Sequence, residues 1–252
     1  MVKKNCIIKS EHLMPHGIYR KEEQMIKAIG FDVGHTLINY RNPLNWRALY
    51  RPALEQAARS CGISLSEEMT AAAIETLLKY NTRVNYRERE VSSDTIFGEI
   101  LDKWQLCLDM DTLKTGFYSF FQAEAEPYPE TLDTLSTLRQ AGIKTGVLTD
   151  AAYGMDNRFS LQDIASLSGL LDVTLTSVDV GYRKPNSTGF QMLMTALQVS
   201  PDEMMYVGDE QKDIVGANQL GIISVLVNRT DTTLDYGQTH TIQSLRELQT
   251  LI

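Results

Sequence analysis

The spacing of hydrophobic residues divides the chain into three parts. Residues 26–31, "IKAIGF", form a short apolar run that stops at Asp32, as is typical of a buried strand. Between about residues 42 and 126, apolar residues recur every three or four positions, which predicts helices with no strand among them. From residue 127 onward, short apolar runs alternate with longer helical periods.

Alternating strands and helices predict a parallel sheet with helices on both faces. We therefore expect an α/β fold, with a Rossmann-like doubly wound parallel sheet as its core. Residues 25–41 and 127–252 would form this core, and residues 42–126 an inserted all-helical cap domain. Residues 1–24 are polar and lack a sustained period, so we interpret them as an N-terminal tail or edge extension.

Composition narrows the class of protein. The chain has 252 residues, of which 43% are hydrophobic, and this is enough for a sizeable core. Its net charge of -8 argues against a nucleic-acid partner. Cys6, Cys61 and Cys107 form no CxxC pair, which fits a reducing compartment. No apolar run approaches the roughly 20 residues of a membrane helix. We expect a soluble, cytoplasmic protein with no membrane partner, as a monomer or homodimer.

Acidic residues follow several of the predicted strands. Asp32 ends the first strand, Thr149 ends the second, and Asp209 ends a later one, with Asp213 four positions beyond it. Lys184 lies on a loop between them. Ligands of open parallel sheets bind beyond the carboxyl ends of the strands. Clustered carboxylates repel one another unless a hard cation joins them, and Mg²⁺ is the usual cation beside a phosphate group. A hydroxyl and a lysine are suitable partners for phosphoryl oxygens.

Four segments in order carry a family resemblance: "FDVGHTL", "GVLTD", "GYRKP" and "VGDEQKDIVGANQLGI". From about residue 26 to 227 the chain resembles the haloacid dehalogenase-like hydrolase superfamily, in its helical-cap, phosphatase-like branch. Most members of this superfamily are Mg²⁺-dependent phosphatases. The resemblance implies a hydrolase that acts on the phosphate ester of a small phosphorylated metabolite.

The resemblance also implies roles for individual residues. Asp32 corresponds to the nucleophile that becomes an aspartyl-phosphate. Thr149 and Lys184 correspond to the groups that hold the transferring phosphoryl group. The implied Mg²⁺ ligands are Asp32, the backbone carbonyl of Gly34, Asp209 and, directly or through water, Asp213.

The first motif departs from the family pattern at Gly34. Most phosphatases of the family carry a second aspartate there, as general acid and base. Losing such a group typically costs roughly 10² to 10⁴ in rate, so we expect a preference for aryl or acyl phosphates, whose leaving groups need little protonation. Asp150, where the family commonly has asparagine, is a candidate replacement acid. His35 is a second candidate, but we favour its interpretation as a structural turn residue.

Other members of the family suggest different activities. Halide-cleaving members have tyrosine at the position of Gly34 and use no Mg²⁺, so Asp209 and Asp213 argue against that activity. Phosphonate-cleaving members use a lysine early in the cap, whereas here the first lysine after the motif is Lys79. A non-catalytic, phosphate-binding regulatory protein remains an alternative.

The substrate contacts are less clear from the sequence. A closing helical cap favours a small substrate. Residues near the first hinge of the cap are candidate specificity contacts, and packing within the cap or simple solvation explains them equally well. These residues are Tyr40, Arg41, Trp46 and Tyr50.

Overall fold

The computed structural model describes residues 25–40, 46–122 and 125–252. The interpretations of residues 1–24 and of Arg41 lie outside these ranges. A six-stranded, fully parallel sheet forms the core, in the order β5-β4-β1-β6-β7-β8. This confirms the predicted Rossmann-like α/β fold. The strands are β1 (Ala28–Phe31), β4 (Lys144–Thr149), β5 (Val173–Thr176), β6 (Met204–Gly208), β7 (Ile223–Val227) and β8 (His240–Ile242).

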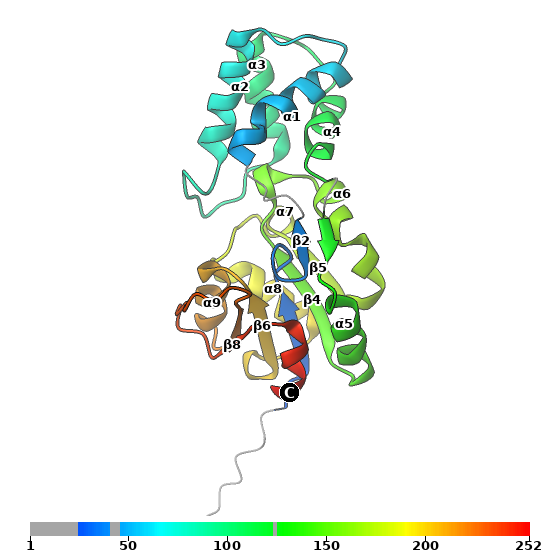
Figure 1. Ribbon diagram of the computed structural model, residues 1–252. Helices are drawn as coiled ribbons and strands as arrows, with labels where there is room; N and C mark the ends of the chain where they lie inside the picture. Colours follow the sequence, from blue (N-terminus) through cyan, green and yellow to red (C-terminus); the bar gives the residue numbers. More distant parts are fainter. Residues whose placement is uncertain (1–24, 41–45, 123–124) are drawn as a thin grey trace, which may run out of the picture.

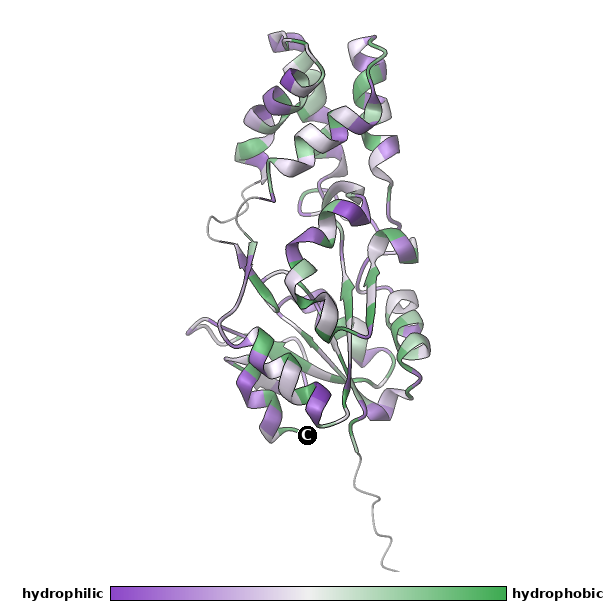
Figure 2. Ribbon diagram, turned by 90° about the vertical axis from the view of Figure 1, so that its right-hand side faces the viewer, coloured by the Kyte–Doolittle hydropathy of each residue, from purple (hydrophilic) through white to green (hydrophobic). Residues whose placement is uncertain are grey.

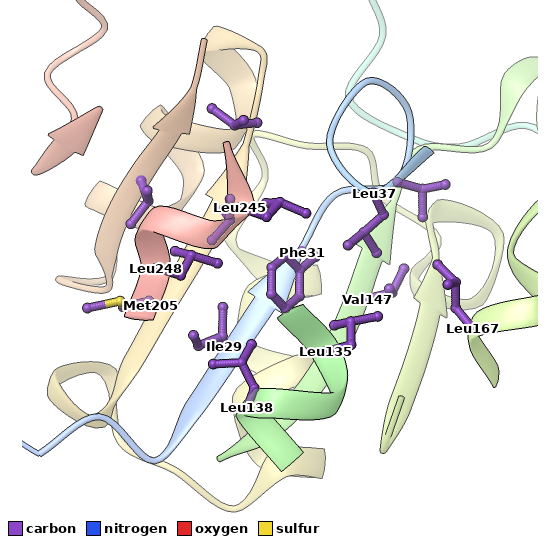
Figure 3. Packing of buried hydrophobic residues seen from close by; sticks show 14 of the residues in the cluster. Ile29, Phe31, Leu37, Leu135, Leu138, Val147, Leu167, Met205, Leu245 and Leu248 are labelled. Atoms are coloured by element: carbon purple, nitrogen blue, oxygen red, sulfur yellow. The ribbon is translucent and has the colours of Figure 1, made fainter. Parts of the chain in front are cut away.

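The central strand β1 is buried on both faces, because its side chains alternate between two hydrophobic clusters. Ile29 and Phe31 pack toward α5 (Thr131–Gln140) and two 3₁₀ segments, Gln162–Leu170 and Leu245–Thr250 (Figure 3). Ala28 packs on the other face, which α8 (Ser187–Leu197) and α9 (Gln211–Asn218) cover. Helices on both faces explain why "AIGF" is apolar at consecutive positions rather than at alternate ones.

The cap is a separate helical layer beyond the carboxyl ends of the sheet (Figures 1 and 2). The chain leaves the core through β2 (Ile38–Tyr40) and returns through β3 (Ala125–Pro127), and these two strands pair antiparallel. Of the described residues between them, none joins the main sheet. Four helices lie there: α1 (Trp46–Ser60), α2 (Glu67–Tyr80), α3 (Ser93–Trp104) and α4 (Met110–Ser119). Within the described ranges, no helix has the length and apolar character needed to cross a bilayer.

The segment after β4 joins the core to the cap. It contains 3₁₀ residues Ala152–Gly154 and the short helix α6 (Asn157–Ser160). Tyr153 and Phe159 are buried in the hydrophobic cluster of the cap, although they follow a core strand in sequence. Residues that follow a core strand therefore complete the hydrophobic cluster of the cap.

A second connection comes from residues 81–92 between α2 and α3, which we call the cap arm. Arg89 forms an antiparallel bridge with Tyr182, just before the loop that carries Lys184. The backbone N–H of Glu90 donates to the carbonyl of Gly181 at 3.0 Å. The cap arm thus reaches the edge of the predicted site.

Candidate active site

Asp32 and Asp209 lie side by side at the carboxyl edge of the sheet. β1 and β6 are neighbours in parallel register, so the residues that follow them emerge together. The Asp32 N–H extends this pairing by donating to the carbonyl of Val207 at 2.9 Å. The Thr36 hydroxyl donates to Asp209 Oδ1 at 3.3 Å. The register of two strands, rather than a local turn, brings these carboxylates together.

Asp213 reaches the same place from the first turn of α9. Its Oδ2 accepts a hydrogen bond of 3.0 Å from the N–H of Glu210, the N-cap residue of that helix. Gly208 makes this approach possible, because a Cβ there would lie 2.4 Å from the Asp213 side chain. Asp213 is fully buried.

Lys184 completes this group, which we call the strand-end cluster: Asp32, Lys184, Asp209 and Asp213. The lysine is only 3% exposed, and its Nζ lies 2.6 Å from one oxygen each of Asp32 and Asp213. It also donates to the carbonyl of Leu148 at 3.1 Å. Burial opposes the charge on Lys184, but Asp213 and Asp32 outweigh it and raise the pKa of the ammonium group.

The strand-end cluster holds more negative than positive charge. Oxygens of Asp32, Asp209 and Asp213 lie within 4.8 Å of one another. Burial, with the charges of Asp32 and Asp213, raises the pKa of Asp209 to about 8. Burial likewise raises the pKa of Asp213 to about 6, although Lys184 opposes this. Asp213 Oδ1 is buried without a hydrogen bond to any described residue, because its approach to Lys184 lacks hydrogen-bond geometry. Clustered oxygen donors with excess negative charge fit a hard divalent cation.

The second motif contributes two residues with different surroundings. Thr149, the last residue of β4, lines the same pocket, and its hydroxyl has no hydrogen bond to another described residue. Asp150 accepts from the N–H of Lys184 at 3.0 Å and lies 3.1 Å from Lys212 Nζ. Burial opposes ionisation of Asp150, but Lys212 and Arg183 outweigh it and lower the pKa of the carboxyl. A carboxylate held ionised in this way has no proton to donate.

The position of Gly34 faces an aromatic residue. A Cβ at Gly34 would lie 3.6 Å from Tyr40 Cε2 and 3.8 Å from the Tyr40 hydroxyl, which are ordinary contacts. His35 is exposed and has a left-handed φ of 56°, and its ring meets the Tyr40 ring edge-on at 5.6 Å. Burial, and then the negative charge of Asp163 and of Asp32, raises the pKa of the Tyr40 phenol.

The strand-end cluster opens into a pocket of about 770 Å³ between core and cap. Trp46 lines this pocket and stacks on Phe121, with ring centroids 3.7 Å apart. Tyr50 does not line it, so our interpretation of Tyr50 as a substrate contact is corrected: the residue is fully buried inside the cap. The Tyr50 hydroxyl bonds to that of Tyr153 and accepts from Asn81 at 2.9 Å.

Several pocket residues escaped the sequence analysis. Arg47, one position after Trp46 on α1, is exposed at the pocket and has no hydrogen bond or ion pair to another described residue. Asp163 lines the pocket beside Tyr40, also without such a partner, and burial raises its pKa to about 6. Arg47 lies within α1 and Asp163 within the 3₁₀ segment Gln162–Leu170, and neither belongs to a motif. Only their position at the pocket identifies them as candidate site residues.

Arg183 also escaped notice, although it precedes Lys184 directly. It belongs to a buried group that we call the arm cluster: Arg87, Glu90, Ser177 and Arg183. The Glu90 carboxylate, 3% exposed, bonds to Arg183 and accepts from Ser177 at 2.6 Å and Arg87 at 2.9 Å. The cap arm therefore anchors the loop that carries Lys184.

Known proteins resemble this chain in sequence and in fold. The model of the haloacid dehalogenase-like hydrolase family matches residues 26–221. The chain is 26% identical to a glyceraldehyde 3-phosphate phosphatase of Methanocaldococcus jannaschii, over 90% of this chain and 97% of the relative. It is 27% identical to (S)-2-haloacid dehalogenase 1 of Pseudomonas sp., over 66% and 81%. Among solved structures, a HAD phosphatase from Thermococcus onnurineus matches with a TM-score of 0.61 and 25% identity, over 90% of this chain and 97% of that one.

Proposed function

The chain belongs to the haloacid dehalogenase-like hydrolases, and from this premise we propose that it is a Mg²⁺-dependent phosphatase acting on a small phosphomonoester. The observation that carries the proposal is the strand-end cluster, where three carboxylates converge and two of them contact one buried lysine. Glyceraldehyde 3-phosphate phosphatase is the name of a relative that aligns over nearly its whole length.

In this mechanism Asp32 attacks phosphorus and carries the phosphoryl group as an aspartyl-phosphate, which water then hydrolyses. Lys184 and Thr149 would hold the phosphoryl oxygens. Asp32, Asp209, Asp213 and the carbonyl of Gly34 are the groups that would hold the metal. Bound there, Mg²⁺ would supply positive charge against the carboxylates and the phosphoryl oxygens.

The same donor set favours phosphate over halide chemistry. Relatives of both kinds exist, so the family alone does not choose between them. An enzyme that displaces halide has no phosphoryl charge to neutralise and no need for three converging carboxylates. The excess negative charge in the strand-end cluster therefore supports the phosphatase.

The pocket supports a small organic phosphate as substrate. Its volume of about 770 Å³ exceeds the volume of a phosphate group, and residues of both the core and the cap line it. Trp46 and Arg47 of the cap lie where the organic part of a substrate would extend. Pockets of this size accommodate metabolite-sized ligands.

The test is release of inorganic phosphate from a panel of sugar, nucleotide, triose and aryl phosphates, with Mg²⁺ and with EDTA. 2-Chloropropionate and a phosphonate are tested separately, as substrates of the two alternative activities. We expect metal-dependent phosphate release and no chloride release. Metal-independent chloride release would instead establish a dehalogenase. Binding of phosphate and Mg²⁺ without any turnover would establish a regulatory protein.

A further inference from the structure

The proposed phosphatase lacks the carboxylic acid that would protonate the leaving group, because Gly34 stands in its position. The residues considered as replacements differ in their surroundings. Asp150 is tied to the Lys184 N–H and to Lys212, which leaves it ionised. His35 is an exposed residue on a left-handed turn. Both line the pocket, but Asp150 has no proton to donate, and the His35 ring lies edge-on against the Tyr40 ring.

Tyr40 has the required position. Its hydroxyl would lie 3.8 Å from a Cβ at Gly34, within the reach of the carboxyl group that a second aspartate would carry there. It lines the same pocket as Asp32, Thr149 and Lys184. Among the described residues the hydroxyl has no hydrogen-bond partner.

The Tyr40 ring is also held in place. Tyr40 ends β2, which pairs with Ala125 of β3 at the base of the cap. Its ring packs against the core cluster on one side and meets the His35 ring at 5.6 Å. A donor fixed by a strand and by ring packing has little freedom to lose when substrate binds.

We infer that Tyr40 is the catalytic residue that acts on the leaving-group oxygen in place of the missing aspartate. This inference rests on the proposed phosphatase function. As Asp32 forms its bond to phosphorus and the P–O bond to the alcohol breaks, the phenol O–H passes its proton to the departing oxygen. The phenolate then takes a proton from the water that attacks the aspartyl-phosphate, which restores the phenol and releases inorganic phosphate and Asp32.

The test compares an alkyl phosphate that needs a proton donor with p-nitrophenyl phosphate, which does not. The variants are Tyr40→Phe, Gly34→Asp and the double variant, with Tyr236→Phe, outside the pocket, as the matched control. The removed hydroxyl leaves the ring packing intact, so the thermal unfolding midpoint should stay close to that of the wild type.

We expect Tyr40→Phe to lower kcat on the best alkyl phosphate of the panel by roughly 10²-fold or more, and to change p-nitrophenyl phosphate turnover by no more than a few-fold. Adding Gly34→Asp should recover alkyl turnover, since its Cβ has room and Gly34 has no left-handed φ. Tyr236→Phe should behave as wild type on both substrates.

Different outcomes would overturn the two proposals separately. If the wild type releases phosphate but Tyr40→Phe affects both substrates equally, or neither, Tyr40 is not the donor and the phosphatase stands. A wild type confined to aryl phosphates also overturns the role of Tyr40. If the wild type cleaves no phosphate ester at all, the proposed function fails and this inference fails with it.

Discussion

The strand-end cluster and the arm cluster are two buried groups of charged residues. They are joined in sequence where Arg183 of the arm cluster directly precedes Lys184 of the strand-end cluster. In the arm cluster one carboxylate lies between two guanidinium groups, and both oxygens of Glu90 accept hydrogen bonds, although Arg87 Nε has none among the described residues. In the strand-end cluster three carboxylates face one lysine, and Asp213 Oδ1 has no hydrogen-bond partner among the described residues.

This difference in charge indicates a structural role for the arm cluster and a ligand-binding role for the strand-end cluster. Charges of opposite sign that contact and hydrogen-bond one another can remain buried without any ligand. Charges of one sign that are buried together destabilise the fold until something compensates them. The arm cluster therefore fastens the cap arm to the core, whereas the strand-end cluster is built for a cation and a phosphoryl group. Four substitutions or additions test this contrast.

The largest expected effect is at the nucleophile. Asp32→Asn should lower phosphate release by roughly 10⁴-fold or more, which corresponds to about 5 kcal/mol of transition-state stabilisation. The substitution removes one negative charge from a cluster that has an excess of them, and the amide oxygen can still accept from Lys184, so the unfolding midpoint should not fall. Steady-state kinetics and thermal denaturation measure both quantities. Retention of most of the activity would refute the assignment of Asp32.

The arm cluster should respond in stability. Glu90→Gln leaves Arg183 and Arg87 buried without their carboxylate, and breaking such a pair costs about 3 kcal/mol. Urea unfolding measures this cost. Glu88→Gln is the matched control, because Glu88 is exposed on the same arm and such changes stay within about 0.5 kcal/mol. Equal effects of the two substitutions would contradict a structural role for Glu90.

Mg²⁺ should stabilise the wild type, because it relieves the repulsion within the strand-end cluster. At 100 times its Kd the gain is about 2.7 kcal/mol, visible as a rise in the thermal midpoint. Asp209→Asn should abolish the rise, while Asp133→Asn on the exposed face of α5 should keep it. A rise that survives Asp209→Asn would place the metal elsewhere.

The smallest effect concerns Asp163, whose pKa burial raises from 3.8 to about 6. A carboxyl with a raised pKa in the folded state costs stability once it ionises, so the cost grows as pH rises from about 4 to about 6. Asp163→Asn should therefore stabilise the protein at pH 8 by about 1 kcal/mol, after allowance for solvent screening of this part-exposed group.

Urea unfolding of wild type and Asp163→Asn at both pH values checks this prediction, and at pH 4 the two proteins should be equally stable. A variant less stable than wild type at pH 8 would mean that Asp163 has a stabilising partner.

Local patterns predicted elements well where burial follows a simple period. The apolar run before Asp32 became β1, and helical spacing after residue 42 became four helices. Local signals failed near element ends. His240–Ile242 form the edge strand β8, although no apolar run marks a strand there. A three-residue edge strand exists only because β7 offers it a partner.

The order of the motifs, and hence the α/β core, follows from the amino-acid sequence alone, as do the candidate residues of the strand-end cluster. Which of these groups meet depends on the tertiary structure. Lys184 reaches Asp32 across 152 positions because parallel strands bring their carboxyl ends to one edge. The pairing of β2 with β3 holds Tyr40 where it faces Gly34. Tyr50 does not line the pocket, because its side chain is buried in the hydrophobic cluster of the cap. Periodicity encodes which face of an element is buried, but contacts between elements depend on packing and register, which no local window of sequence contains.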